Sequence, residues 1–181
     1  MGYQWLEQAG VDVPWYPWVS NRIMAPKHEF FMWLAVQQRL LTQDRMVKMG
    51  FLQCNVCWLC GQEEECHQHL FFSCTYSRKC LTLVESWLQI CIPVQDVMEW
   101  WFKYRNRSLL VRQVLAARIA YLMYEIWHAR NRSRVESILL LPTVLVRQVQ
   151  KGIVLRLKVR NVIGSTSKVN LWLERICNGV N

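Results

Sequence analysis

Four side chains that could together bind one metal ion stand close to one another in the middle of the chain. Their spacing is C-x2-C-x8-H-x4-C, formed by Cys57, Cys60, His69 and Cys74. Zinc binds thiolate and imidazole readily, and two cysteines separated by two residues can reach one ion from a tight turn. Gly61, directly after the second cysteine, suits such a turn. The spacing therefore predicts one tetrahedral zinc ion with these four ligands.

The predicted ion has a structural role, because four protein ligands leave no open position for water or substrate. Free buried thiols and disulfides are the two alternatives. Free thiols fit poorly with the crowding, since six of the eight cysteines fall within the 27 residues 54–80. Disulfides need an oxidising compartment, and residues 1–10 show no basic start followed by an apolar run and a cleavage site. Metal binding is therefore favoured.

The choice of ligands within this site leaves alternatives. Cys54, Cys66 and His67 lie close enough in the sequence to replace a neighbouring ligand. We favour His69 over His67 as the histidine ligand.

The spacing of apolar residues predicts a mainly α-helical chain that positions these ligands. The proline-punctuated residues 3–19 are expected to be extended. Thr42 is the predicted N-cap of the second helix. Residues 142–160 fit a helix, although 153–160 alternate like a strand, and we favour the helix. The predicted helices are 27–41, 43–49, 77–90, 109–134 with Ser108 as its N-cap, 142–160 and 168–177, with a further apolar turn or two in 96–104.

Length and charge predict two regions. A chain of 181 residues can form one domain with a core, or a small domain with a helical extension, and is short for a complete multi-domain enzyme. Residues 1–102 carry 7 Lys/Arg and 10 Asp/Glu, a net charge of −3, whereas residues 103–181 carry 15 and 3, a net charge of +12. We predict a zinc-binding helical domain at 1–102, with its core at about 15–90, and a basic helical C-terminal region at 103–181.

The basic C-terminal region makes RNA or DNA the leading partner, because such a surface can neutralise several phosphates and release their counterions. Solvated faces of amphipathic helices are the alternative, and an anionic membrane surface is a weaker one. Trp127, beside several arginines, could stack a base or pack into the core. The candidate nucleic-acid contacts are Arg130, Arg132, Arg134, Lys151, Arg156, Lys158 and Arg160.

Four stretches of the first half carry a resemblance to a known family: APKHEFFMWLA from Ala25, RLLTQDR from Arg39, CWLCG from Cys57 and HLFFSCTYS from His69. They resemble the zinc-binding domain that follows the polymerase in plant LINE-type retrotransposon reverse transcriptases, over residues 4–88. The later stretch EIWHARNR is similar to the helical tail after that module.

This resemblance implies an α-helical zinc module. It implies Glu65 as the acidic position four residues before the histidine. Cys54 and Cys66 depart from the family pattern as extra thiols. The implied ligands agree with the spacing argument and are Cys57, Cys60, His69 and Cys74.

Catalysis is not expected from this chain. Template-directed polymerisation needs closely placed carboxylates that hold two magnesium ions. The aspartates are only Asp12, Asp44 and Asp96, and the run Glu63–Glu65 lies inside the zinc loop. The same argument excludes a ribonuclease H or endonuclease centre. A nucleophile pair of Cys66 and His67 is not expected either, because adjacent residues on an extended segment face apart.

Two classes of function remain. In the first, the chain is a non-catalytic zinc-binding module derived from a retroelement reverse transcriptase, and it binds RNA or DNA through its basic C-terminal half. In the second, it is a protein–protein docking module or an inert retroelement relic with structural zinc only. We expect no small-molecule substrate. No apolar run approaches the roughly 20 residues that span a bilayer, so we expect an intracellular protein of the nucleus or cytoplasm.

Overall fold

The computed structural model describes residues 16–19, 21–90, 103–160, 172–174 and 176–177. No strand occurs within these ranges, where a single isolated bridge joins Val56 and Glu64. The prediction of a mainly α-helical chain is confirmed. The elements are α2 (Tyr16–Val19), α3 (Pro26–Val36), α4 (Gln43–Lys48), the π-helix η1 (His69–Ser73), α5 (Thr75–Leu88), α7 (Leu109–Glu136) and α8 (Pro142–Val159).

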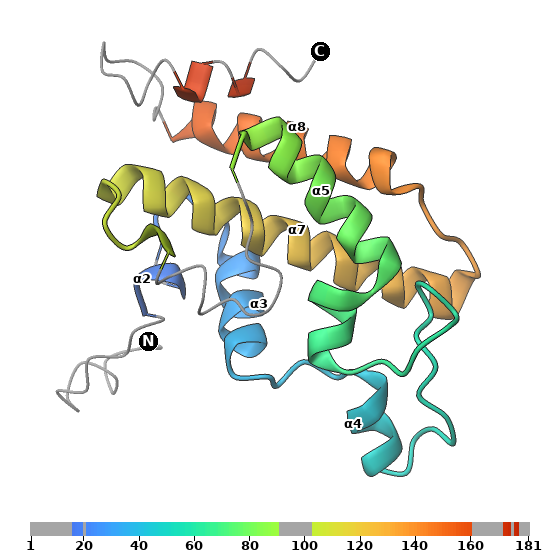
Figure 1. The fold of residues 1–181 in the computed structure, drawn as a ribbon. Coiled ribbons are helices and arrows are strands. Elements are labelled where there is room, and N and C mark those ends of the chain that lie inside the picture. The colour runs from blue at the N-terminus through green and yellow to red at the C-terminus, as the bar shows by residue number, and fades with distance from the viewer. Residues whose placement is uncertain (1–15, 20, 91–102, 161–171, 175, 178–181) are drawn as a thin grey trace, which may run out of the picture.

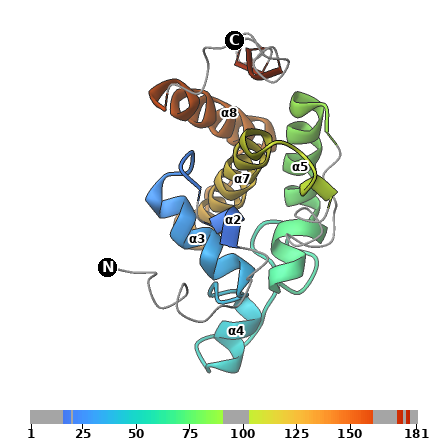
Figure 2. The same ribbon diagram turned by 90° about the vertical axis from the view of Figure 1, so that its left-hand side faces the viewer.

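The long helix α7 passes through the middle of the molecule, and the other long helices pack around it (Figure 1). Helices α3 and α8 contact α7, and α5 packs against α8. Figure 2, turned by 90°, shows α3, α5 and α8 on different sides of α7. The boundary predicted after residue 102 adjoins residues 91–102, which lie outside the described ranges, and it stays a prediction. Among the helices described, none is long and apolar enough to cross a bilayer.

Helix α3 ends earlier than the predicted range 27–41. The backbone of Gln38 is left-handed, with φ of 52°, and the N–H of Arg39 donates to the carbonyl of Leu34 at 2.8 Å. This six-residue closure is the usual way in which a helix stops. Leu40 then turns into the core, where it is 4% exposed. The spacing of Leu40 from the apolar residues of α3 fits a continued helix. In the structure it is the turn after α3 that buries this side chain.

The other predicted segments have mixed outcomes. The helix expected at 142–160 is confirmed as α8. The extended prediction is wrong at Tyr16–Val19, which form α2, and residues 3–15 lie outside the described ranges. Most of 96–104 also lies outside them. Within 168–177, residues 172–174 and 176–177 are helical.

Arg118 of α7 is buried without a hydrogen-bond partner for its guanidinium among the described residues. The guanidinium lies 4.9 Å from the ring centroid of Trp87 and 5.0 Å from that of Trp172. Burial lowers the pKa of Arg118 to about 9. Cation–π contacts therefore compensate only part of the cost of removing this charge from water.

Helices α7 and α8 approach closely where Tyr121 lies on Gly152. A methyl group at Gly152 would lie 2.3 Å from the Tyr121 hydroxyl oxygen and 2.4 Å from the ring carbon that bears it. The Tyr121 ring also contacts His28 of α3, with ring centroids 4.4 Å apart. Moving the ring away from an added methyl group would therefore disturb a contact with a third helix.

Gly152→Ala should destabilise the protein by up to about 2 kcal/mol, measured by chemical denaturation. Overpacking costs about 1–3 kcal/mol, and alanine returns about 1 kcal/mol through its helix propensity. The same change made in a Tyr121→Leu background has no ring to displace, so there it should stabilise. A Gly152→Ala variant that is more stable than the parent in both backgrounds would contradict this packing.

Candidate metal centre

The loop between α4 and η1 supplies two of the four predicted ligands. Gly61 has φ of 65°, and its N–H donates to the carbonyl of Cys57 at 2.8 Å. This turn brings Cys60 back beside Cys57, as the glycine predicts. The loop is tied across its base, because the N–H of Cys57 donates to the carbonyl of Glu63 at 2.8 Å.

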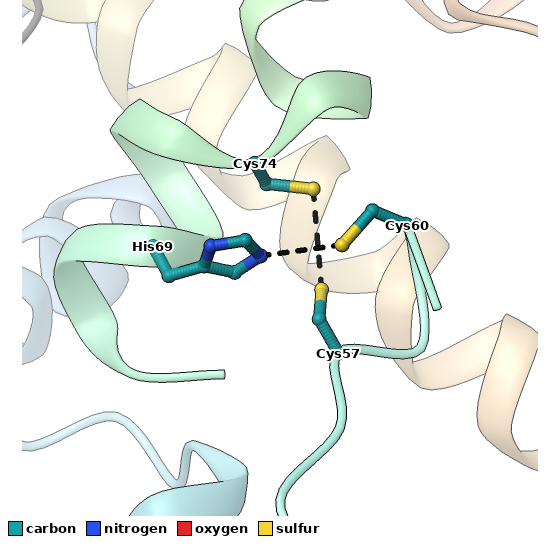
Figure 3. A group of neighbouring side chains, drawn as sticks. All are labelled: Cys57, Cys60, His69 and Cys74. Atoms are coloured by element: carbon teal, nitrogen blue, oxygen red, sulfur yellow. Dashed lines mark hydrogen bonds between the residues drawn. The ribbon is translucent and has the colours of Figure 1, made fainter. Parts of the chain in front are cut away.

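The π-helix η1 supplies the other two ligands. The N–H of Cys74 donates to the carbonyl of His69 at 2.7 Å, a bond between residues five apart that defines a π turn. His69 begins this turn, and Cys74 follows it directly at the start of α5. The wider turn places both side chains beside the cysteines of the loop (Figure 3).

The four ligand atoms surround a space that fits one zinc ion. All four lie within 4.8 Å of one another. The sulfurs of Cys57 and Cys74 are 3.9 Å apart, and Cys60 Sγ is 3.4 Å from His69 Nε2. Zinc bonds of about 2.3 Å to sulfur and 2.0 Å to nitrogen at tetrahedral angles give separations of about 3.8 and 3.5 Å. The lines that join these two pairs cross in Figure 3. The donor set and its dimensions match a structural zinc site.

The surroundings of Cys74 favour its thiolate. The sulfur shares a hydrogen bond with that of Cys57 and lies near the backbone N–H groups of Ser77 and Tyr76 in the first turn of α5, and these lower the pKa of Cys74 to about 5. The shared proton and burial raise the pKa of Cys57. The pair therefore retains one proton that a zinc ion would displace on binding.

His69 is oriented by a carboxylate. Its Nε2 faces the cysteines, and its Nδ1 lies 3.0 Å from Glu63 Oε2. A carboxylate on the second ring nitrogen fixes the tautomer and orientation of a metal-binding histidine. Glu63 is exposed and lies in the same loop as the cysteines, so this loop both binds the ion and orients the histidine.

Residues 1–80 match the family model described as zinc-binding in reverse transcriptase. This match contains all four ligands of the candidate site. No curated protein and no solved structure matches the chain. The zinc-binding family is an accessory domain of reverse transcriptases and is distinct from their catalytic domain. The resemblance of the sequence to a reverse transcriptase zinc-binding domain agrees with this match, and a single zinc ion is the cofactor that fits the site.

Neighbouring residues of the zinc-binding domain have other roles. Cys54 is exposed and lies outside the ligand group. Cys66 accepts a hydrogen bond from the N–H of His69 at 3.3 Å, so it satisfies a backbone donor at the beginning of the helical turn. The His67 ring packs against Phe71, with centroids 4.9 Å apart. Within the described residues the ligand group is the one that the spacing predicts.

Glu65 connects the zinc-binding loop to α4 and α7. Its carboxylate is fully buried and accepts from Arg130 Nε at 3.0 and 3.1 Å and from Arg130 Nη2 at 2.5 Å. It also accepts from the N–H of Gln43 at 3.0 Å, while the Glu65 carbonyl accepts from the N–H of Asp44 at 3.2 Å. Thr42 stands at the predicted N-cap position of α4, but its side chain makes no capping bond. Glu65 caps this helix instead.

The prediction that Arg130 contacts nucleic acid is wrong for this structure. Arg130 is 1% exposed, because its guanidinium pairs with Glu65 and lies 4.6 Å from the ring of Trp58 and 5.0 Å from that of Trp127. Trp127 packs against the core and against this cation. The sequence shows a basic stretch here, but it gives no sign that one of its arginines has a buried partner 65 residues away.

The other candidate cations differ in whether their side chains are paired, hydrogen-bonded or exposed. Arg132 is half-exposed and pairs with Glu136 at 3.2 Å. Arg156 is half-buried, and its guanidinium donates to the carbonyls of Ile23 at 2.9 Å and Met24 at 2.7 Å, which ties α8 to the segment before α3. The exposed candidates are Arg134, Lys151, Lys158 and Arg160.

Two of these exposed cations form a line with a third that sequence analysis did not select. Arg147, Lys151 and Lys158 are all exposed on α8. Their spacings of four and seven residues are close to one and two turns of an α-helix, so the three lie on one face over about 16 Å. The spacing of four between Arg147 and Lys151 was the available signal. We call these three residues the α8 cation row.

Proposed function

We propose that the chain is a non-catalytic zinc-binding module derived from a plant LINE-type retroelement reverse transcriptase, and that it binds RNA or DNA. The accessory family matched by residues 1–80 supports an origin in a reverse transcriptase and a role other than catalysis, while the plant LINE-type origin is proposed from the sequence resemblance. We propose a nuclear or cytoplasmic location, where both nucleic acids occur.

The observation that carries the nucleic-acid proposal is the α8 cation row. Helix α8 contains no acidic residue, and three of its cations point along one exposed face. A phosphate backbone is a linear array of negative charges, and a row of cations can neutralise several of them at once. Such contacts fix the position of the strand and give little sequence preference.

The double change Lys151→Gln and Lys158→Gln should weaken binding of labelled single-stranded RNA and duplex DNA, measured by fluorescence anisotropy. Each lost phosphate contact should reduce the slope of log K against log salt by about 0.7 for a single strand and 0.9 for a duplex. The double change should therefore reduce the slope by about 1.4 for RNA, with zinc content unchanged.

The matched control is Lys27→Gln with Lys48→Gln, which removes two exposed cations from α3 and α4. Figure 1 shows α4 at the opposite end of the molecule from α8. If both double variants weaken binding equally, the effect comes from net charge alone and the α8 cation row is not the contact surface. Salt-independent binding by the parent protein would contradict phosphate recognition altogether.

A further inference from the structure

An open apolar groove with a volume of about 620 Å³ lies between α5 and the beginning of α8. One wall is a single face of α5, and the other is the first turn of α8 with the residue before it. The lining is mostly apolar and includes Leu83 of α5 with Leu141 and Pro142, while its two cations, Arg78 and Lys79, are exposed. The lining residues are Arg78, Lys79, Thr82, Leu83, Leu141, Pro142 and Thr143.

Exposed apolar side chains continue this groove along the connection between α7 and α8. Leu141 is 68% exposed, and Ile138, Leu139 and Val144 are between 41% and 49% exposed. The connection is fixed against α5, because the Tyr76 hydroxyl donates to the carbonyl of Leu140 at 2.7 Å. An apolar surface of this kind, held in place and edged by polar groups, is typical of a protein interaction site.

The charge of the groove selects the kind of partner. Its lining contains two cations and, among the residues described, no carboxylate. The positive end of the α8 dipole lies at the same place, since Leu141 gives no capping side chain and the first turn of α8 holds no acidic residue. An occupant with carboxylates beside its apolar side chains would complement all of these features.

We infer that this groove binds an acidic amphipathic helix of a partner protein. Leucine-like side chains three and four residues apart would enter between Leu83 and Leu141, and glutamates beside them would face Arg78 and Lys79. A helix is the fitting shape because the groove is formed by two helices, which is how apolar helical faces are commonly bound. A small molecule would fill the groove but leave the continuing surface at Ile138 and Leu139 exposed.

A labelled synthetic helix of about 18 residues, with leucines on one face and glutamates elsewhere, tests this inference by fluorescence anisotropy with the full zinc-loaded chain. Two matched peptides serve as controls, one with lysine in place of glutamate and one with serine in place of leucine. The parent protein should bind the leucine–glutamate peptide at least tenfold more tightly than either control.

Two variants locate the site. Leu141→Asp should weaken binding of the leucine–glutamate peptide at least tenfold, and Leu155→Asp, at a residue 63% exposed elsewhere on α8, should leave it unchanged. The double change Arg78→Glu and Lys79→Glu should shift preference towards the lysine peptide. Melting temperatures and zinc content show whether each variant is folded.

Three outcomes would overturn the inference. If the serine peptide binds as tightly as the leucine–glutamate peptide, the binding is charge attraction to a basic protein and does not depend on the apolar groove. Binding of the apolar anion anilinonaphthalene sulfonate in the groove, without peptide binding, would show a small-molecule site. Self-association that Leu141→Asp abolishes, again without peptide binding, would show that a second copy of the chain covers this surface. The Lys151→Gln and Lys158→Gln double variant should keep peptide binding. A failure of the nucleic-acid proposal can therefore be distinguished from a failure of this inference.

Discussion

Cys60→Ser should abolish stoichiometric zinc binding and lower the melting temperature by more than about 10 °C. Structural zinc contributes about 10–16 kcal/mol of apparent binding free energy, which acts as folding free energy. About 1 kcal/mol shifts the melting temperature of a chain of this size by about 2–4 °C. Zinc content by elemental mass spectrometry and thermal unfolding by circular dichroism measure both effects.

Cys54→Ser and Cys66→Ser are the controls for this prediction. Both remove a thiol from the same segment, and neither residue belongs to the ligand group. Each should keep one zinc ion per chain, with at most a small loss of stability for Cys66, whose sulfur accepts a backbone hydrogen bond. Full zinc content in Cys60→Ser, or its loss in Cys54→Ser, would assign the ligands differently.

The second large effect is expected at Arg130, and Arg118 on the same helix gives the comparison. Arg130→Met should destabilise the protein by about 3–5 kcal/mol, because it leaves the Glu65 carboxylate buried without its cation. Arg118→Met should be neutral or stabilising, because it replaces a buried charge that has no hydrogen-bond partner in the described residues. Each guanidinium lies within 5.0 Å of the ring centroids of two tryptophans, so the comparison separates these aromatic contacts from the polar contacts of Arg130, of which the ion pair with Glu65 is the main one.

Denaturant unfolding of the zinc-loaded variants measures these differences. Adding Glu65→Gln to Arg130→Met should restore part of the lost stability, since a neutral amide costs less to bury than an unpaired carboxylate. Equal effects of the two arginine substitutions would show that the aromatic contacts, and not the ion pair, determine the stability at Arg130.

The zinc site was predictable because it is encoded locally. Ligand type and spacing identify Cys57, Cys60, His69 and Cys74, and Gly61 marks the turn between them. The chemistry of zinc restricts the choice to few residue types, so a short pattern carries much of the information. Helices α5 and α8 were predictable for a related reason, since each has an apolar face with a period of 3.6 residues.

Long-range pairing was not predictable from spacing. Glu65 and Arg130 are 65 residues apart, and both belong to charged stretches that resemble ordinary solvated surface. Only the packing of the zinc-binding loop against α7 buries them together. The helical turn η1 was not predicted at all, because five residues are too few to establish a period.

The π turn at η1 lets the connection between two of the ligands differ in length by one residue. His69 and Cys74 meet the cysteines of the loop because their connection has about one residue more per turn than an α-helix. Deleting a single residue between them would allow an ordinary α turn, in which residues four apart lie on the same face, so the histidine and the cysteine would keep nearly the same relative direction. Substitutions within Leu70–Ser73 would change packing and leave the ligand geometry in place. Variation in this segment is therefore expected in residue type and in the presence or absence of one residue.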